Sequence, residues 1–280
     1  MMHTRRLAAI GLLLAVLSCS AFASQVAGIL TLGSTSRSLG VGGAFAAHDD
    51  SATAVGHNPA GLAWGQEVVV SSLVARDFGI ISYGAITIAL PHVGFSVLQL
   101  DSGDIPTQAG TLRYVSRALL AGIAARLGPV ALGVRGKLYL LSMPAEADGW
   151  AIDPALLVVT EIVQLGLILE NAATRAVRFA DGHLEVWTRS VTVGVAASVE
   201  PFEDARFTAL LEGRGLFGPS PVLRGGLELV LGPMSLRGGY NGHGFTFGLG
   251  VAFSSYTLDW AYADHPDLGG SHRASVTFRF

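Results

Sequence analysis

The sequence predicts an all-β fold, a transmembrane antiparallel β-barrel of about fourteen strands with an N-terminal plug segment. Three observations support this prediction: an apolar composition without helical spans, a repeated alternation of apolar and small side chains, and an alternation of short and long connections. Half of the 280 residues are hydrophobic and only 14% are charged, whereas a soluble domain carries about 25% charged residues. This composition is typical of a protein that lies in a membrane.

A helical membrane protein is the main alternative explanation, and it requires apolar runs of about 20 residues. Beyond the N-terminal segment, the longest stretch without Asp, Glu, Lys or Arg is residues 78–100. Pro91 and His92 interrupt this stretch, which also contains three glycines, and glycine is costly inside a helix. We therefore interpret it as two strands and a turn.

The first 23 residues have the features of a secretory signal peptide. Arg5 and Arg6 form a positively charged start, residues 7–17 form a short apolar run, and Ala23 ends a small-residue cleavage site. Cleavage there makes Ser24 the first residue of the mature protein. An uncleaved membrane anchor is the alternative, but the apolar run is short for a span.

The chain has one cysteine, Cys19, and it lies within the predicted signal peptide. Cleavage after Ala23 therefore leaves a mature chain without a disulfide, a thiolate catalyst or a thiolate metal site. Lipidation of Cys19 is a second alternative, although residues 16–19 fit a lipoprotein motif poorly.

Side chains alternate in character along many segments. In residues 243–253, Phe, Leu and Val occupy every second position, and small or polar residues lie between them. The same alternation recurs in residues 130–140, 190–196, 223–231 and 256–262. Successive side chains of a strand point to opposite faces, and a soluble sandwich has a polar outer face. Here the second face is mostly Gly, Ala, Ser and Thr with scattered charges, so we predict a crowded lumen on that face and lipid on the apolar face.

The connections between predicted strands differ in length from one rim of the barrel to the other. Short turns at 128–129 and 232–233 alternate with longer polar loops at 101–115 and 172–185. Bacterial barrels have an even strand number and this asymmetry, with the short turns periplasmic, which places both termini on the periplasmic side. The strands are predicted to begin near Glu67, Gly79, His92, Arg117, Val130, Trp150, Ile162, Trp187, Arg206, Leu223, Met234, Gly244, Ser255 and Ser271.

The barrel is assigned to residues 66–280. Its last strand alternates up to the terminal Phe280, and it must pair with the first strand because an open edge in lipid leaves backbone groups unsatisfied. A terminal Phe on such a strand also resembles the signal read by the outer-membrane barrel assembly machinery, which is therefore an expected partner. Pro154 conflicts with a regular strand, because proline cannot donate to the ladder. We expect a bulge or a strand end there.

Residues 24–65 differ from the rest of the chain and are rich in Gly and Ala. Asp49 or Asp50 can cap a short helix, and Asn58 with Pro59 marks a turn. A segment of small residues ahead of a barrel is suited to fold inside the lumen as a plug. The residues singled out in it are Gly40, Gly42, Gly43, Asp49, Asp50, Asn58, Pro59 and Gly61.

Within this segment, residues 36–45 (SRSLGVGGAF) resemble the start of the N-terminal hatch of the FadL-like superfamily of outer-membrane transporters. Residues 49–52 (DDSA) and 58–62 (NPAGL) continue the match. The barrel agrees at residues 165–167, 170–171, 237–240, 247–250, 258–262 and 270–273. In layout the chain is similar to the smaller, PorV-type members.

The resemblance implies an outer-membrane β-barrel channel for the passive uptake or export of small hydrophobic molecules, with no enzymatic activity and no cofactor. The superfamily also includes the PorV-type proteins of secretion, so the alternative is a non-enzymatic scaffold that binds partner proteins. The loops 101–115 and 172–185 are modest and contain few aromatic residues, which favours the channel. The expected surroundings are the lipid bilayer of the cell outer membrane, and the expected ligand is a small hydrophobic solute.

Several other activities find no support in the sequence. The net charge is −3 and no Lys/Arg cluster is present, which excludes nucleic acid as an expected partner. No Ser-His-Asp or paired-carboxylate constellation can be assembled. His48, Asp49, Asp50 and His57 have the chemistry of metal ligands, but we interpret them as capping and hydrogen-bonding groups of the plug and expect no metal. The glycines of residues 40–43 lack the context of a phosphate-binding loop, so we expect them to pack against the barrel wall.

Charged residues fall on the predicted lumen face with both signs. We expect them to pair with one another and with the plug, because unpaired buried charge is costly, and some of them to contact a solute. The candidates are Arg135, Lys137, Asp153, Glu170, Arg224, Glu228, Arg237, Asp259 and Arg279.

The third strand, residues 92–100, suggests a lateral opening. Val93, Phe95 and Val97 have outward parity, whereas Leu98 and Leu100 have the opposite parity. A one-residue slip flips every later side chain, and a bulge absorbs such a slip. This pattern resembles the kinked strand through which FadL-type channels release solute sideways. The hypothesis of a lateral opening requires broken pairing near residues 96–99. The alternatives are a simple strand end near Val97, with Leu98 and Leu100 packed under the following loop, and a closed bulge without a function.

Overall fold

The computed structural model describes residues 28–77, 79–107, 110–143, 145–265 and 269–280. The predicted signal peptide, residues 1–23, lies outside the described residues. Short helical turns precede the strands: η1 (Gly28–Thr31), α2 (Ser36–Gly40), α3 (Ser51–Ala54) and η2 (Pro59–Trp64). The strands are β1 (Val69–Asp77), β2 (Ile81–Leu90), β3 (Val93–Asp101), β4 (Ile105–Thr107), β5 (Gly110–Leu112), β6 (Val115–Leu127), β7 (Val130–Met143), β8 (Ala147–Val159), β9 (Val163–Glu170), β10 (Ala173–Phe179), β11 (Leu184–Glu185), β12 (Ser190–Phe202), β13 (Ala205–Leu216), β14 (Val222–Leu231), β15 (Met234–Tyr240), β16 (Phe245–Ala252), β17 (Tyr256–Ala263) and β18 (Ser271–Arg279).

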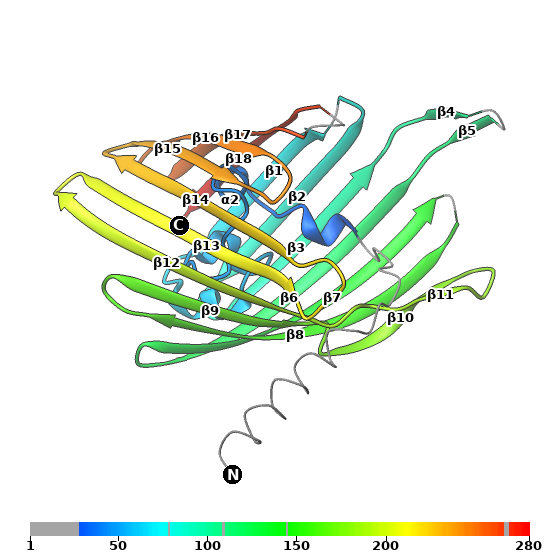
Figure 1. Ribbon diagram of the computed structural model, residues 1–280, viewed down its shortest axis with the longest axis horizontal. Coiled ribbons are helices and arrows are strands. Elements are labelled where there is room, and N and C mark those ends of the chain that lie inside the picture. The colour runs from blue at the N-terminus through cyan, green and yellow to red at the C-terminus, as the bar shows by residue number, and fades with distance from the viewer. Residues whose placement is uncertain (1–27, 78, 108–109, 144, 266–268) are drawn as a thin grey trace, which may run out of the picture.

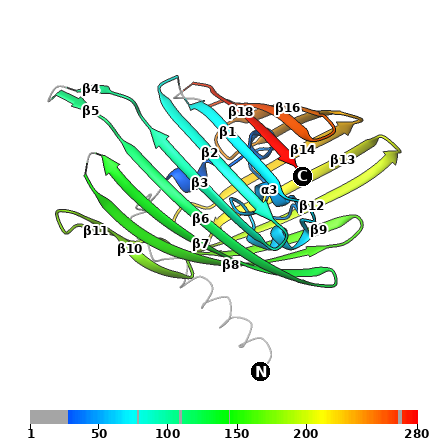
Figure 2. The ribbon, with the colours of Figure 1, turned by 180° about the vertical axis from the view of Figure 1, so that it is seen from behind.

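Fourteen of these strands close into an antiparallel barrel, which confirms the predicted fold class. The wall runs β1, β2, β3, β6, β7, β8, β9 and then β12 to β18. The first and last strands pair from Val69 opposite Arg279 to Asp77 opposite Ser271, and Figure 2 shows them side by side. Each of the fourteen begins within three residues of its predicted start. No helix in the described residues is long and apolar enough to cross a membrane.

Two ribbons that the sequence analysis did not predict extend the wall at one rim. Strands β4 and β5 pair with each other, and β10 and β11 form a hairpin beside β8; both project beyond the barrel in Figure 1. Their connections lie between β3 and β6 and between β9 and β12. We call this end the long-loop rim, and the opposite end, with turns such as 91–92, 128–129 and 232–233, the short-turn rim.

The bulge or strand end expected at Pro154 does not occur in the strand that contains it, and the neighbouring strand is interrupted instead. Strand β8 runs through Pro154, which faces Val134 of β7. On its other side, residues 155–159 of β8 pair with β9, and residues 147–152 pair with β10. Between β9 and β10, Asn171 adopts a positive φ of 58°. The wall therefore bends where proline cannot donate a ladder hydrogen bond.

The outer surface of the barrel is apolar. Side chains on the outward face are about half exposed to the surroundings, as for Leu167 (45%), Phe247 (56%) and Ile123 (62%). Their inward neighbours on the same strands are buried, which gives the alternating burial of β1, β3, β6 and β16. An apolar band of this extent is unfavourable in water and matches the lipid-facing band of a transmembrane barrel.

Strand β3 has neither a bulge nor an end near Val97, so the hypothesis of a lateral opening there and both of its alternatives are wrong. The ladders of β3 with β2 and with β6 run without a break through Gln99, which faces Gly84 on one side and Arg117 on the other. Leu98 is 2% exposed and points inward, and Gln99 points outward. The parity of the strand never changes. Leucines occur on the inward face because the lumen beside this strand is itself apolar.

Residues 28–65, which we call the inner segment, lie inside the barrel (Figure 1). Their short helices have local reasons to form. Thr35 caps α2 by accepting from the Ser38 amide, and Asp50 caps α3 by accepting from the Ala52 amide. Pro59 occupies the first turn of η2, where its missing N–H is not needed.

Inward-facing glycines of the wall allow the backbone of the inner segment to approach closely. A Cβ on Gly226 would lie 2.5 Å from the carbonyl oxygen of Val41, and one on Gly166 would overlap the carbonyl oxygen of Ala46. Only glycine leaves room for such an approach. We call this set the glycine collar: Gly94, Gly122, Gly133, Gly166, Gly194, Gly226, Gly239 and Gly248.

Candidate functional site: an apolar chamber beside the inner segment

One side of the lumen is an apolar chamber. Inward side chains of β1, β2, β3, β6, β7 and β10 form one buried cluster there, mostly of Ala, Leu and Val, together with Tyr83, Tyr139 and Trp187. We define the chamber by Leu73, Tyr83, Leu98, Leu120, Tyr139, Leu141, Val177 and Trp187. These residues are each no more than 7% exposed, so the chamber excludes water.

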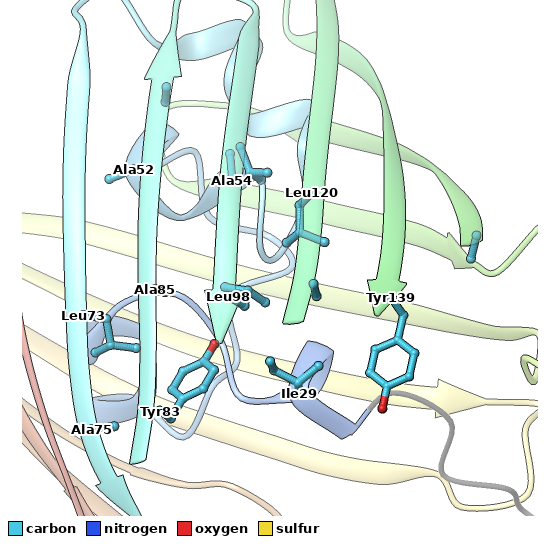
Figure 3. Packing of buried hydrophobic residues seen from close by; sticks show 14 of the residues in the cluster. Ile29, Ala52, Ala54, Leu73, Ala75, Tyr83, Ala85, Leu98, Leu120 and Tyr139 are labelled. Carbon is cyan, nitrogen blue, oxygen red and sulfur yellow. The ribbon is translucent and has the colours of Figure 1, made fainter. Parts of the chain in front are cut away.

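The first turn of the inner segment occupies this chamber. Ile29 on η1 is 3% exposed and belongs to the same cluster, and Leu30 and Leu32 pack against it. Figure 3 shows Ile29 between Tyr83 and Leu98 on one side and Tyr139 on the other. The chamber is therefore filled by the chain's own apolar side chains.

Polar atoms of the chamber's aromatic residues have partners within the protein. The Tyr83 hydroxyl donates to the Gly33 carbonyl at 2.5 Å, and the hydroxyls of Tyr114 and Tyr139 are 2.6 Å apart. The Trp187 indole N–H donates to the Arg175 carbonyl at 2.8 Å. The ring faces thus pack in apolar contact within the cluster while their polar atoms remain satisfied.

Elsewhere in the lumen, charged side chains form paired clusters. In the first, Arg37 of the inner segment lies 2.7 Å from Glu228 and 2.8 Å from Asp50. Glu228 also pairs with Arg237 at 2.6 Å, and Arg237 pairs with Asp259 at 2.6 Å. Because each buried charge has a partner of opposite sign, the cluster ties the inner segment to β14, β15 and β17.

The second cluster lies at the bend of the wall. Asp153 is fully buried and pairs with Arg135 at 2.5 Å and Lys137 at 2.8 Å, and it accepts from the Asn171 amide at 2.8 Å. Lys137 also donates to the Asn171 side chain at 2.7 Å. Arg135 in turn donates to the carbonyls of residues 55–57 at 2.7–3.3 Å. It therefore satisfies carbonyls at the end of α3 that the helix leaves free.

A third, looser cluster lies between β9 and β14. Glu170 is 3.5 Å from Arg214, and Arg224 is 3.9 Å from Glu212. Glu212 also accepts from the Ala46 amide at 2.9 Å, which connects this cluster to the inner segment. The last predicted lumen residue, Arg279, is only half-buried and donates to Thr257 at 3.2 Å.

The predicted residues of the inner segment serve its own packing. Asn58 is fully buried: its amide nitrogen donates to Ala46 at 2.6 Å and to Leu156 of the wall at 3.1 Å, and its oxygen accepts from Ala60 at 3.0 Å. Gly61 faces Ala54 closely. Asp49 lies 3.5 Å from His48 and is partly exposed.

Three of the predicted glycines face the barrel wall. Gly42 and Gly43 have positive φ angles of 73° and 77°. A Cβ on Gly40 would lie 3.1 Å from Gly248 of β16. These glycines therefore lie close against the wall, where a side chain would leave little room.

The two histidines of the inner segment pack within it. The rings of His48 and Phe45 stack with centroids 4.6 Å apart. Burial, together with the positive charges of Arg214 and Arg224, lowers the pKa of His57 to about 3, so its imidazole is neutral at physiological pH. Within the described residues, His57 Nε2 has no hydrogen-bond partner in the protein.

Sequence reasoning missed several residues that the structure brings into the lumen. Arg37, Glu212, Arg214 and Arg273 take part in its ion pairs, and Tyr83, Tyr139 and Trp187 line the chamber. Glu212 and Arg214 share the strand face of the inward-pointing Leu210 on β13, so the alternation along this strand could have identified both as lumen residues. Alternation alone cannot identify the residues of the chamber, because apolar side chains also occupy the outward face of the same strands.

Comparisons with known proteins agree on the fold. No family model matches the sequence, and no curated protein matches it. The fold is similar to that of the CymD monoaromatic hydrocarbon channel, with a TM-score of 0.58 and 14% identity over 89% of this chain and 98% of CymD. A mutant of the TodX monoaromatic hydrocarbon channel has a TM-score of 0.54 and 13% identity over 88% of this chain and 98% of its own. A Pseudomonas aeruginosa FadL homologue has a TM-score of 0.50 and 11% identity over 89% of this chain and 98% of its own. The fold of the barrel is thus similar to the folds of these three proteins.

Proposed function

We propose that this chain is an outer-membrane channel for the passive passage of small hydrophobic molecules, with the inner segment acting as its plug. The observation that carries the proposal is a water-excluding apolar chamber inside a barrel whose exterior is also apolar. The likeness to the CymD and TodX monoaromatic hydrocarbon channels supports a small aromatic hydrocarbon as the solute. In an outer membrane the short-turn rim faces the periplasm.

The chamber supplies binding without chemistry, and we propose no enzymatic role. A small aromatic molecule gains about 25 cal/mol for each Å² of apolar surface that it buries. The neighbouring charges are held in pairs with one another, so the solute need not strip water from a free ion. Because β3 is continuous, the proposed route stays within the lumen, past η1 and the glycine collar.

Passage along this route requires η1 to leave the chamber, since Ile29 fills it. Ile29→Ala removes most of the side chain that docks there, which weakens a buried apolar contact by about 2–4 kcal/mol. The undocked, open state then becomes more populated. We expect the rate of toluene uptake to rise about tenfold or more.

The measurement is uptake of labelled toluene by vesicles whose outer leaflet is lipopolysaccharide, a slow barrier to hydrophobic molecules. Ile86→Ala, the same substitution at a lipid-facing position that is 59% exposed, is the matched control and should leave the rate unchanged. If folded Ile29→Ala takes up toluene no faster than the wild type, η1 does not obstruct the route.

A further inference from the structure

A second cavity lies between the inner segment and the wall, near the long-loop rim. It has a volume of about 220 Å³, and Leu32 borders both this cavity and the apolar chamber. We call it the polar vestibule and define it by Leu39, His57, Asp77, Arg224, His243 and Arg273. His265 also lines it, and its ring lies 5.9 Å from the ring of His243; the two histidines lie in the loops that follow β17 and β15.

Four buried polar atoms on the residues that line the vestibule have no hydrogen-bond partner within the described residues. They are His57 Nε2, Asp77 Oδ1, Arg224 Nε and Arg273 Nε. Asp77 is 3% exposed and Arg273 6%. Such groups cost about 1–3 kcal/mol each when nothing satisfies them, and the four residues that carry them all line this one cavity.

The arginines that line the vestibule are only partly engaged by the protein. Arg273 uses its two terminal nitrogens on the Leu32 carbonyl and on Asp77 Oδ2, the latter at 3.0 Å. Arg224 has only a long contact of 3.9 Å with Glu212. Both Nε–H groups are buried and without a partner in the described residues. The two arginines, from strands β14 and β18, both line this cavity, and a pair of guanidinium groups is complementary to a carboxylate.

Asp77 requires a hydrogen-bond donor on the ligand, whereas the arginines require an acceptor. Its Oδ2 is taken by Arg273 and its Oδ1 has no partner, so the complementary ligand atom is a donor such as a hydroxyl. Leu32 and Leu39 add apolar surface to the lining. The volume is that of about seven water molecules, which suits a ligand of about ten non-hydrogen atoms.

We propose that the polar vestibule binds a small carboxylic acid that also carries a hydroxyl group. The carboxylate accepts from Arg224 and Arg273, the hydroxyl donates to Asp77, and the apolar body lies against Leu32 and Leu39. This site goes beyond the proposed passage of hydrophobic molecules and does not depend on it. It would give the barrel a second ligand class, bound at the long-loop rim.

Calorimetric titration of the full protein in detergent tests this site, with 4-hydroxybenzoate as the probe. Benzoate lacks the hydroxyl and phenol lacks the carboxylate. The expected order of affinity is 4-hydroxybenzoate, then benzoate, with phenol weakest. Arg224→Gln should weaken binding of 4-hydroxybenzoate about tenfold or more, because one charge-assisted hydrogen bond is lost. Arg206→Gln, on adjacent β13 in an exposed pair with Glu200, is the matched control.

The comparison of the three probes uses the wild-type protein and so does not depend on whether a variant folds. For the variants, heat-modifiable migration checks that each one retains its barrel. If the wild type binds none of the three probes, or binds phenol as tightly as 4-hydroxybenzoate, the vestibule holds only water and the proposal is overturned. Equal binding by Arg224→Gln and the wild type would overturn it as well. Failure of the channel proposal would appear separately, as an absence of toluene uptake by the wild type.

Discussion

Gly166→Val is expected to unseat the inner segment while the barrel stays closed. Gly166 points inward on β9, and any side chain there would overlap the backbone carbonyl of Ala46. A backbone atom cannot rotate away, so the segment must shift. Overpacking costs about 1–3 kcal/mol when side chains can adjust, and a backbone clash costs at least as much. We expect the leak of a small hydrophilic dye to rise about tenfold or more.

Dye release from vesicles measures this leak, and Gly238→Val is the matched control. Gly238 lies on the outward face of β15, where a Cβ would meet nothing within 4 Å, so its variant should be as tight as the wild type. Heat-modifiable migration should be retained by both. A Gly166→Val protein that stays tight would mean that the glycine collar does not hold the seal.

Asp153→Ala is expected to lower the free energy of unfolding by about 3–5 kcal/mol, because it leaves two buried cations without a counter-charge. Asp153 is fully buried, and both Arg135 and Lys137 depend on it. Arg135 also holds the carbonyls of residues 55–57. The inner segment should therefore loosen together with the wall.

Urea unfolding of the reconstituted protein measures this loss. Asp148→Ala, on the same strand, is the matched control, because Asp148 and Arg175 form an exposed pair at 3.2 Å with side chains 45% and 49% exposed. Such pairs contribute about 0–1 kcal/mol. Equal stability of the two variants would show that the buried cluster contributes no more than a surface pair.

The wall could be predicted from the sequence because a strand in lipid has only two faces. Phe247 and Leu249 meet lipid while Thr246 and Gly248 face the lumen, and this alternation fixes the register of β16. The turns at 128–129 and 232–233 separate such runs clearly, so the strand starts were accurate. The bend at Pro154 was foreseeable for the same reason, since a proline between two neighbours must disturb one of them.

The contents of the lumen were harder to predict. Alternation distinguishes faces only where the two faces differ, and beside β3 both are apolar. Leu98 and Leu100 therefore suggested a slip in register that does not occur. The pairing of Arg37 with Glu228 joins residues 191 positions apart, and no local pattern specifies such a contact. Periodicity assigned charges to the lumen, but it could not say which of them meet.

The most direct test of the central claim is solute selectivity in vesicles with a lipopolysaccharide outer leaflet. The measurement compares the uptake of labelled toluene with that of arabinose, with and without the wild-type protein. The account predicts faster uptake of toluene and no change for arabinose, because the chamber excludes water and the glycine collar closes the lumen to hydrophilic solutes. Uptake of neither solute would contradict the channel and favour a scaffold that binds partner proteins, and equal acceleration of both would indicate a general pore.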